Sequence, residues 1–177
     1  MLGCSPLLIK FLPNDYAKSV FEINLAHLKK EGIRGIITDL DNTLVPWDEP
    51  NANDTVIRWI EEIKQHGMQV IIASNNREER VKQFCSPLEI PYIHRAKKPL
   101  QGVYKKALKR MELRKEEVVV IGDQLMTDIL GANAFGLRTI LVVPVAVTDG
   151  LATKFNRMME KRVLQIMKRK GMIYWEE

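Results

Sequence analysis

The chain has 177 residues, 46% of them hydrophobic, and a formal net charge of +5. This length can bury one sizeable core, so we expect a single domain over 1–177, and no apolar run is long enough to cross a bilayer. Residues 151–177 hold seven Lys/Arg and three Glu, which places +4 of the charge there and argues against a uniformly basic nucleic-acid-binding protein.

The first residues and the cysteines point to a reducing compartment. Met1–Pro6 contain no basic residue, and Pro6 comes too early for the apolar region of a secretory signal peptide, so we expect no such signal. Cys4 and Cys85 lack the spacing of a metal-binding pair and need not form a disulfide. These features favour a cytoplasmic protein.

Residues 1–32 are expected to form a helical extension in front of the core. Asn14 or Asp15 is a candidate cap for a helix that runs through about Lys30, with Gly32 just past its end. The apolar residues on its inner face would be Val20, Phe21, Leu25 and Leu28. We expect this face to pack on the core or on a partner.

Residues 33–143 alternate between short apolar runs and amphipathic segments. Strands are expected around 36–37, 68–73, 91–94, 118–121 and 139–143, and helices over 54–66, 77–84, 99–111 and 127–134. The strands are too apolar to have a face in water, so the alternation predicts a parallel sheet with helices on both sides. The fold class is therefore α/β, a Rossmann-like doubly wound sheet.

Polar residues follow these strands at the points where the strands end. Asp39 and Asp41 come after the first run, and Ser74, Lys98 and Asp123 follow later ones. Sheets of this kind bind ligands beyond the carboxyl ends of their strands. Two carboxylates held close together repel each other, and a divalent cation such as Mg²⁺, which prefers oxygen ligands, relieves that repulsion.

These stretches together resemble the haloacid dehalogenase superfamily of phosphatases, over roughly residues 33–143. The matching stretches, in the family's order, are Asp39-Leu40-Asp41-Asn42-Thr43, Ser74 after an apolar strand, Lys98 before Pro99, and Gly122-Asp123 with Asp128 following. More narrowly, the chain is similar to the capless YqeG-type branch and to mitochondrial phosphatidylglycerophosphate phosphatases. That similarity includes Ala96-Lys97-Lys98-Pro99 and Gly122-Asp123-Gln124-Leu125-Met126-Thr127-Asp128.

The resemblance implies that three aspartates carry the chemistry. Asp39 would be the nucleophile that forms an aspartyl-phosphate. Asp41 would protonate the leaving oxygen and then activate water, which requires a raised pKa. Mg²⁺ would be held by Asp39, by the main-chain carbonyl of Asp41 and by Asp123.

The resemblance also implies a set of phosphate-binding and supporting residues. The phosphoryl oxygens would be bound by Asn42, Ser74, Asn75 and Lys98, the two asparagines through main-chain groups. Thr43 and Asp128 would support the site, although Thr43 can also be a turn cap. Asp128 stays open between holding a metal-bound water or Lys98 and capping a helix that begins at Thr127.

The spacing leaves no room for a cap domain. Only a loop and one helix fit between Thr43 and Ser74, and one helix and a strand between Ser74 and Lys98. An open site favours a large substrate, such as a lipid head group or a macromolecule, or closure by a second copy of the chain.

Residues 151–170 predict a basic amphipathic helix. Its apolar positions are Leu151, Phe155, Met158, Val163, Ile166 and Met167, and its basic positions are Lys154, Arg157, Lys161, Arg162, Lys168, Arg169 and Lys170, opposed only by Glu160. Two compatible interpretations stay open: the helix covers the sheet or a subunit interface, and its basic face lies on an anionic membrane.

Three functions stay open. The first is a Mg²⁺-dependent phosphomonoester hydrolase, for which the resemblance implies phosphatidylglycerophosphate as the substrate, and the second is a capless phosphatase of a soluble or macromolecular phosphate. The third is a non-catalytic module that binds a membrane, RNA or a ribosome. A scaffold has no use for the aspartates together with Ser74 and Lys98, so we expect an enzyme with a phosphorylated substrate. The charge distribution disfavours nucleic acid as a partner.

Overall fold

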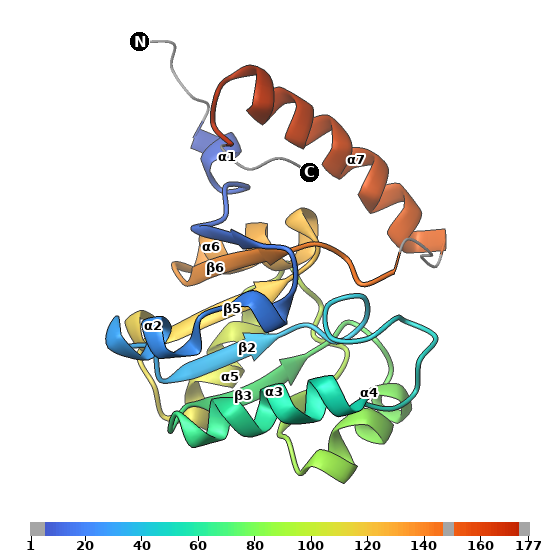
Figure 1. The fold of residues 1–177 in the computed structure, drawn as a ribbon. Helices are drawn as coiled ribbons and strands as arrows, with labels where there is room; N and C mark the ends of the chain where they lie inside the picture. The colour runs from blue at the N-terminus through green and yellow to red at the C-terminus, as the bar shows by residue number, and fades with distance from the viewer. Residues whose placement is uncertain (1–5, 147–150, 174–177) are drawn as a thin grey trace.

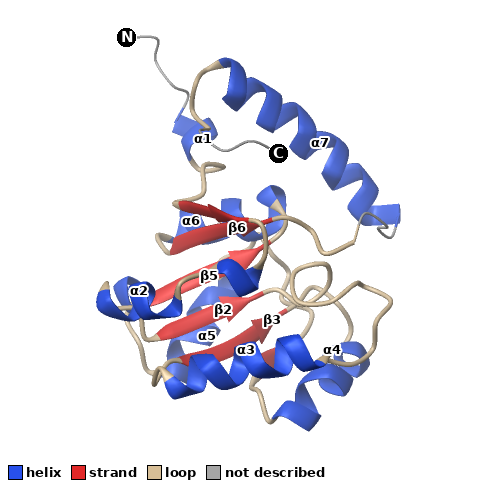
Figure 2. Cartoon of the chain, in the orientation of Figure 1, coloured by secondary structure: helices blue, strands red, loops and turns tan. Residues whose placement is uncertain are grey.

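A parallel sheet forms the centre of the molecule (Figures 1 and 2). The computed structural model describes residues 6–146 and 151–173, with the side chains of 8–146 and 157–173. Within these residues the sheet has six strands in the order β1-β6-β5-β2-β3-β4, and every neighbouring pair is parallel. The strands are β1 Asp15–Ala17, β2 Gly35–Thr38, β3 Gln69–Ala73, β4 Tyr92–Ile93, β5 Val118–Gly122 and β6 Arg138–Val142. The predicted doubly wound sheet is confirmed.

Helices cover both faces of this sheet (Figure 2). Among the described residues the α-helices are α1 Pro6–Ile9, α2 Leu25–Lys30, α3 Asp54–Gln65, α4 Glu78–Cys85, α5 Gly102–Met111, α6 Leu130–Phe135 and α7 Leu151–Arg169. Three 3₁₀ turns, Val20–Glu22, Ser86–Leu88 and Lys115–Glu117, and a π-helical turn, Leu125–Ile129, complete the elements. None of the elements within these ranges forms a cap domain, as expected.

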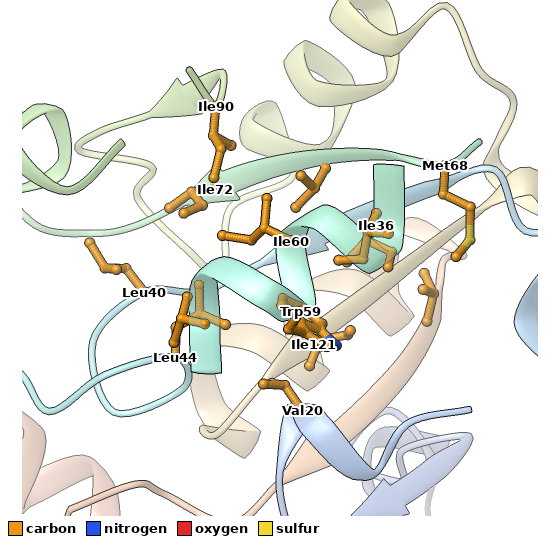
Figure 3. Packing of buried hydrophobic residues seen from close by; sticks show 14 of the residues in the cluster. Val20, Ile36, Leu40, Leu44, Trp59, Ile60, Met68, Ile72, Ile90 and Ile121 are labelled. Atoms are coloured by element: carbon orange, nitrogen blue, oxygen red, sulfur yellow. The ribbon is translucent and has the colours of Figure 1, made fainter. Parts of the chain in front are cut away.

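The alternation of side chains along β2 divides the core into two layers. Ile36 packs on the face covered by α2, α3 and α4, where Trp59 and Ile60 lie close to it (Figure 3). Ile37 points the other way, toward Tyr104 of α5. Burying one such side chain stabilises the fold by about 1.5–3 kcal/mol, so both layers hold β2 firmly in the centre of the sheet.

The predicted helix over 14–30 is wrong. Residues 15–17 are extended and add β1 to the edge of the sheet beside β6, and α2 begins only at Leu25, capped by the Asn24 side chain. The pairing of β1 with β6, more than a hundred residues away in the sequence, overrides the local helical pattern. It covers the edge of β6 that would otherwise be open. Phe21, expected on the inner face, is 40% exposed.

Two other boundaries differ from the prediction. Pro99 lies in a turn and α5 begins three residues later, at Gly102. The helix expected to open at Thr127 begins with the π-helical turn at Leu125 and continues into α6. The π-helical turn contains Asp128 and buries its side chain, so Asp128 is not a helix cap.

The carboxyl-terminal helix forms as α7, but only part of its inner face is the expected one. Met167 is buried, as expected, whereas Met158 and Ile166 are 46% and 45% exposed, and Glu160, expected among the polar residues, is buried. The predicted positions Leu151, Lys154 and Phe155 lie outside the described side chains. None of the described helices is both long and apolar enough to cross a membrane.

The pairing of the amino-terminal segment with β6 can be tested at Asn14. The Asn14 side chain accepts hydrogen bonds from the backbone N–H of the buried Thr139 at 2.9 Å and from its hydroxyl at 3.2 Å. Asn14→Ala should therefore lower the free energy of unfolding by about 1–3 kcal/mol, measured by urea titration. The exposed Asn51→Ala should change it by less than about 0.5 kcal/mol. Equal stabilities of the two variants would contradict this account of β1.

Candidate active site

The end of β2 places Asp39 at the centre of the carboxyl edge of the sheet. Asp39 still donates its backbone N–H to Ile121 of β5, at 3.0 Å, so its position is fixed by the sheet ladder. The chain then turns sharply: Asn42 has a φ of 63° and donates its N–H to the carbonyl of Val45 at 2.7 Å. The Asn42 side chain accepts from the N–H of Trp47. This turn keeps Asp39 and Asp41 at the same end of the sheet.

Three buried carboxylates meet at this edge. Asp39, Asp123 and Asp128 each offer an oxygen, and these oxygens all lie within 4.8 Å of one another. Such a set of hard oxygen donors suits a divalent cation such as Mg²⁺. Asp123, which follows β5, accepts a hydrogen bond from Thr43 at 2.8 Å. The three carboxylates therefore fit the metal site implied by the resemblance, with Asp128 as a further carboxylate beside the expected ligands.

Burial raises the pKa values of two of these three carboxyl groups, Asp123 and Asp128. It raises the pKa of Asp123 to about 6; the charge of Asp39 adds to this shift, while Arg157 and Thr43 oppose it. Burial also raises the pKa of Asp128, against the opposing charge of Lys98. Buried carboxylates of this kind favour any cation that can approach them, since a positive charge restores the ionised form.

Lys98 is the cation that joins two of these carboxylates. Its Nζ lies 2.8 Å from Asp39 Oδ1 and 2.7 Å from Asp128 Oδ1. Burial would lower the pKa of Lys98, but the charges of Asp128 and Asp39 outweigh it and raise that pKa, so the lysine is protonated. Asn75 holds the backbone on either side: its side chain accepts from the Lys98 N–H at 2.8 Å and donates to the Lys98 carbonyl at 3.2 Å.

Asp41 lies in a separate set of contacts. Its carboxylate accepts from Arg80 Nε at 3.1 Å, from the Asn76 side chain at 3.1 Å and from Ser74 Oγ at 3.5 Å. Burial raises the pKa of Asp41 and the charge of Asp39 adds to it, while Asn76 and Arg80 act in the opposite direction. A raised pKa is what a general acid requires, and burial of Asp41 raises it more than the charge of Asp39 does.

All of the residues singled out in the sequence lie at this edge, but three of their partners were missed. Arg80 and Asn76 contact Asp41, and Arg157 of α7 contacts Asp123. Arg80 precedes the buried Phe84 of α4 by four residues, and this spacing on a helix predicts that both side chains lie on the inner face. In the structure the Arg80 guanidinium lies over the Phe84 ring. For Arg157 the only signal was the single acidic residue, Glu160, one turn away on a basic helix.

The arrangement can support phosphoryl transfer. It combines a carboxylate at a fixed strand end, a second carboxyl group with a raised pKa, a protonated lysine and a donor set for a divalent cation. Positive groups beside an ionised carboxylate allow an anionic phosphate to approach it, because they offset the repulsion between the two anions.

Comparisons with known proteins identify relatives of the chain. Residues 36–97 match the family described as haloacid dehalogenase-like hydrolase, and residues 95–144 match the family described as HAD-hydrolase-like. The chain is 56% identical over 167 residues to the "Probable phosphatase YqeG" of Bacillus subtilis, covering 94% of this chain and 97% of that protein. It is 26% identical over 178 residues to the chloroplastic/mitochondrial phosphatidylglycerophosphate phosphatase 1 of Arabidopsis thaliana, covering 91% of this chain and 49% of that protein.

A solved structure shares the fold. The cobalt-bound deoxy-D-mannose-octulosonate 8-phosphate phosphatase of Haemophilus influenzae aligns with a TM-score of 0.56 and 18% identity, over 77% of this chain and 90% of that one. At this identity the similarity concerns the fold alone.

The close packing of β5 against Asp128 gives a test of the site's geometry. A Cβ added at Gly122 would overlap the Asp128 carboxyl group, which accepts from Lys98 and from the Gln124 N–H. Gly122→Ala should therefore displace Asp128 and lower the free energy of unfolding by about 1–3 kcal/mol in a urea titration. Gly102→Ala, where a Cβ would meet open space at the start of α5, should be neutral or stabilising by up to about 1 kcal/mol. A Gly122→Ala variant as stable as Gly102→Ala would show that this contact is not tight.

Proposed function

The chain belongs to the haloacid dehalogenase-like hydrolases and is a phosphatase of that superfamily, and from this premise we propose a Mg²⁺-dependent phosphomonoester hydrolase with Asp39 as nucleophile. One observation carries the proposal: the buried Asp39 carboxylate contacts protonated Lys98 and lies within a group of three carboxylates at the edge of the sheet. The non-catalytic alternative is set aside, because the chain is an enzyme.

In the first half of the reaction, an Asp39 oxygen attacks the phosphorus atom and the bond to the leaving oxygen breaks. The protonated Asp41 carboxyl gives its proton to that oxygen, which leaves as an alcohol. Lys98, Ser74 and main-chain groups of Asn42 and Asn75 would hold the phosphoryl oxygens. The raised pKa of Asp41 and the hydrogen bond from Ser74 toward it support these roles. The product of this half is an aspartyl-phosphate on Asp39.

In the second half, water attacks the phosphorus atom of the aspartyl-phosphate. Asp41, now ionised, removes a proton from this water, and the bond between phosphorus and the Asp39 oxygen breaks. Inorganic phosphate leaves, Asp39 is ionised again and Asp41 is protonated for the next cycle. Splitting one slow displacement into two easier ones is the advantage of the covalent route.

The metal would be held by Asp39, Asp123 and the main-chain carbonyl of Asp41. When bound, Mg²⁺ supplies positive charge between nucleophile and substrate. Thr43, which donates to Asp123, and Asp128, which accepts from Lys98, would position the ligand and the lysine rather than react. The oxygen-only donor set supports Mg²⁺ over softer metals.

We further propose phosphatidylglycerophosphate as the substrate, with a soluble or macromolecular phosphate as the alternative. Support comes from the similarity to the Arabidopsis thaliana enzyme and from the lack of a cap over the site among the described residues. A site without a cap can admit a head group that stays attached to a lipid.

Peripheral contact with an anionic membrane, on its cytoplasmic side, would bring such a head group to the site. On α7 the exposed basic residues are Lys161, Arg162, Lys168 and Arg169, and the exposed Met158 and Ile166 lie among them. Each basic residue near an anionic surface contributes about 1 kcal/mol, and salt screens the contribution. The same surface could instead meet a second copy of the chain.

The role of Asp39 can be tested with a generic phosphate ester in the presence of Mg²⁺. Asp39→Asn should keep the fold and lower kcat by more than about 10⁴-fold, because the neutral amide is a poor nucleophile. The matched control is Asp48→Asn in the exposed loop after β2, which should keep wild-type activity. Excess chelator should abolish wild-type turnover and added Mg²⁺ restore it. Substantial turnover by Asp39→Asn would refute the assignment, and full activity in chelator would refute the metal dependence.

The substrate can be tested by comparing kcat/KM for phosphatidylglycerophosphate in vesicles with that for a panel of soluble phosphates. We expect the lipid to be preferred and the preference to decline as salt weakens attachment to the vesicles. Higher kcat/KM for a soluble phosphate, with no salt dependence, would favour the alternative.

A further inference from the structure

The guanidinium of Arg157 on α7 makes two contacts with Asp123. Its Nη2 forms an ion pair with the Asp123 carboxylate, and its Nη1 donates to the Asp123 carbonyl at 3.0 Å. The Asp123 side chain has no exposed surface. The element farthest along the chain therefore supplies a cation to a carboxylate that the proposed function assigns to the metal.

Glu160 fixes the position of this arginine. It is buried, accepts a hydrogen bond from the Met126 N–H at 3.2 Å and lies 3.4 Å from Arg157 Nη1. One carboxylate thus ties α7 to the π-helical turn that follows Asp123. Burying a carboxylate costs free energy unless it is paired, so the docked position of Glu160 depends on Arg157 and on the Met126 N–H.

Two basic side chains offset part of the negative charge of the three carboxylates at the edge of the sheet. Lys98 lies between Asp39 and Asp128, and Arg157 lies on Asp123. A divalent cation that takes an oxygen from Asp123 would lie beside the guanidinium and repel it. The two cations therefore compete for the same carboxylate.

We propose that Arg157 is a tethered counter-ion of the metal site, and that α7 is an autoinhibitory strap released when the divalent cation binds. The inference rests on the metal site of the proposed function and adds its regulation. In the docked state Arg157 neutralises Asp123 and hinders metal entry. Binding of the cation weakens the ion pair, so α7 undocks at its Arg157 end.

The surroundings of α7 allow this movement. A cavity of about 640 Å³ lies between α7, β6 and the π-helical turn, and Asp123, Arg157, Glu160 and Leu164 are among the residues that line it. Toward its carboxyl end α7 is anchored by the buried Met167, which belongs to an apolar cluster with Phe11, Leu125 and Ile129. Figure 1 shows α7 as a separate layer beyond the β6 side of the sheet. The helix can therefore pivot about Met167 while Arg157 moves into the cavity.

Titration of the metal-free protein with MgCl₂ in a calorimeter tests the proposal. Arg157→Gln removes the competing charge and should bind Mg²⁺ about tenfold more tightly than the wild type, within the range of roughly 5–150-fold typical of coupled sites. Arg162→Gln, an exposed arginine on the same helix, should bind it as the wild type does. If Arg157→Gln does not fold, Arg157→Lys should show a smaller gain, because a lysine cannot make both contacts with Asp123.

Hydrogen exchange gives a second readout, because coupling between two sites is reciprocal. Mg²⁺ should raise amide exchange in residues 157–166 of the wild type and of Arg162→Gln, but not in Arg157→Gln, where these residues exchange faster from the start. Equal Mg²⁺ affinity of Arg157→Gln and Arg162→Gln, or unchanged exchange in α7 on adding Mg²⁺, would overturn the proposal.

The result can be separated from that of the proposed function by assaying the same proteins on a generic phosphate ester. The expected affinity and exchange changes without any hydrolysis would support the strap and contradict the proposed function. Hydrolysis that requires Asp39, together with equal Mg²⁺ affinities, would support the function and overturn the strap. Absence of Mg²⁺ binding in every variant would overturn both.

Discussion

The structure depends on offsetting the negative charge of several carboxylates at a buried edge of the sheet. Asp39, Asp123 and Asp128 lie within 4.8 Å of one another, where water does not screen their repulsion well. Each of them therefore has a cation: Lys98 lies between Asp39 and Asp128, and Arg157 lies on Asp123. Both cations come from elements far from β2 in the sequence: Lys98 from the turn held by Asn75, and Arg157 from α7.

Asp39 and Asp41 have the different surroundings that the proposed chemistry needs. Asp39 contacts protonated Lys98, whereas Asp41 is held by Arg80 and Asn76 and has a pKa raised chiefly by burial. Two carboxyl groups with different surroundings can act as nucleophile and as acid in one site. The sheet creates the difference, because Asp39 continues the ladder with β5 while Asp41 lies two residues later, directly before the turn over 42–44.

Much of this arrangement could be predicted because it is local in the sequence. The apolar runs of β2, β3, β5 and β6 and the polar residues that follow them are visible in short windows, and parallel topology brings them to one edge. What could not be predicted depends on distant pairings. Residues 15–17 form a strand because they pair with the edge strand β6. Arg157 points inward because it pairs with Asp123, and Glu160 does so because it accepts a hydrogen bond from the Met126 N–H. Only the spacing to Glu160, one helical turn from Arg157, distinguishes Arg157 in the sequence from the exposed Arg162.

The central claim is that Asp39 becomes phosphorylated during turnover. Rapid acid quenching with a phosphate ester and Mg²⁺, followed by borohydride reduction of the acyl phosphate and peptide mapping by mass spectrometry, measures this directly. The account predicts that the reduced residue is Asp39 and that its yield rises to a steady level within the first turnover. Reduction at Asp41 or Asp123 instead, or phosphate release with no residue modified at any time, would contradict it.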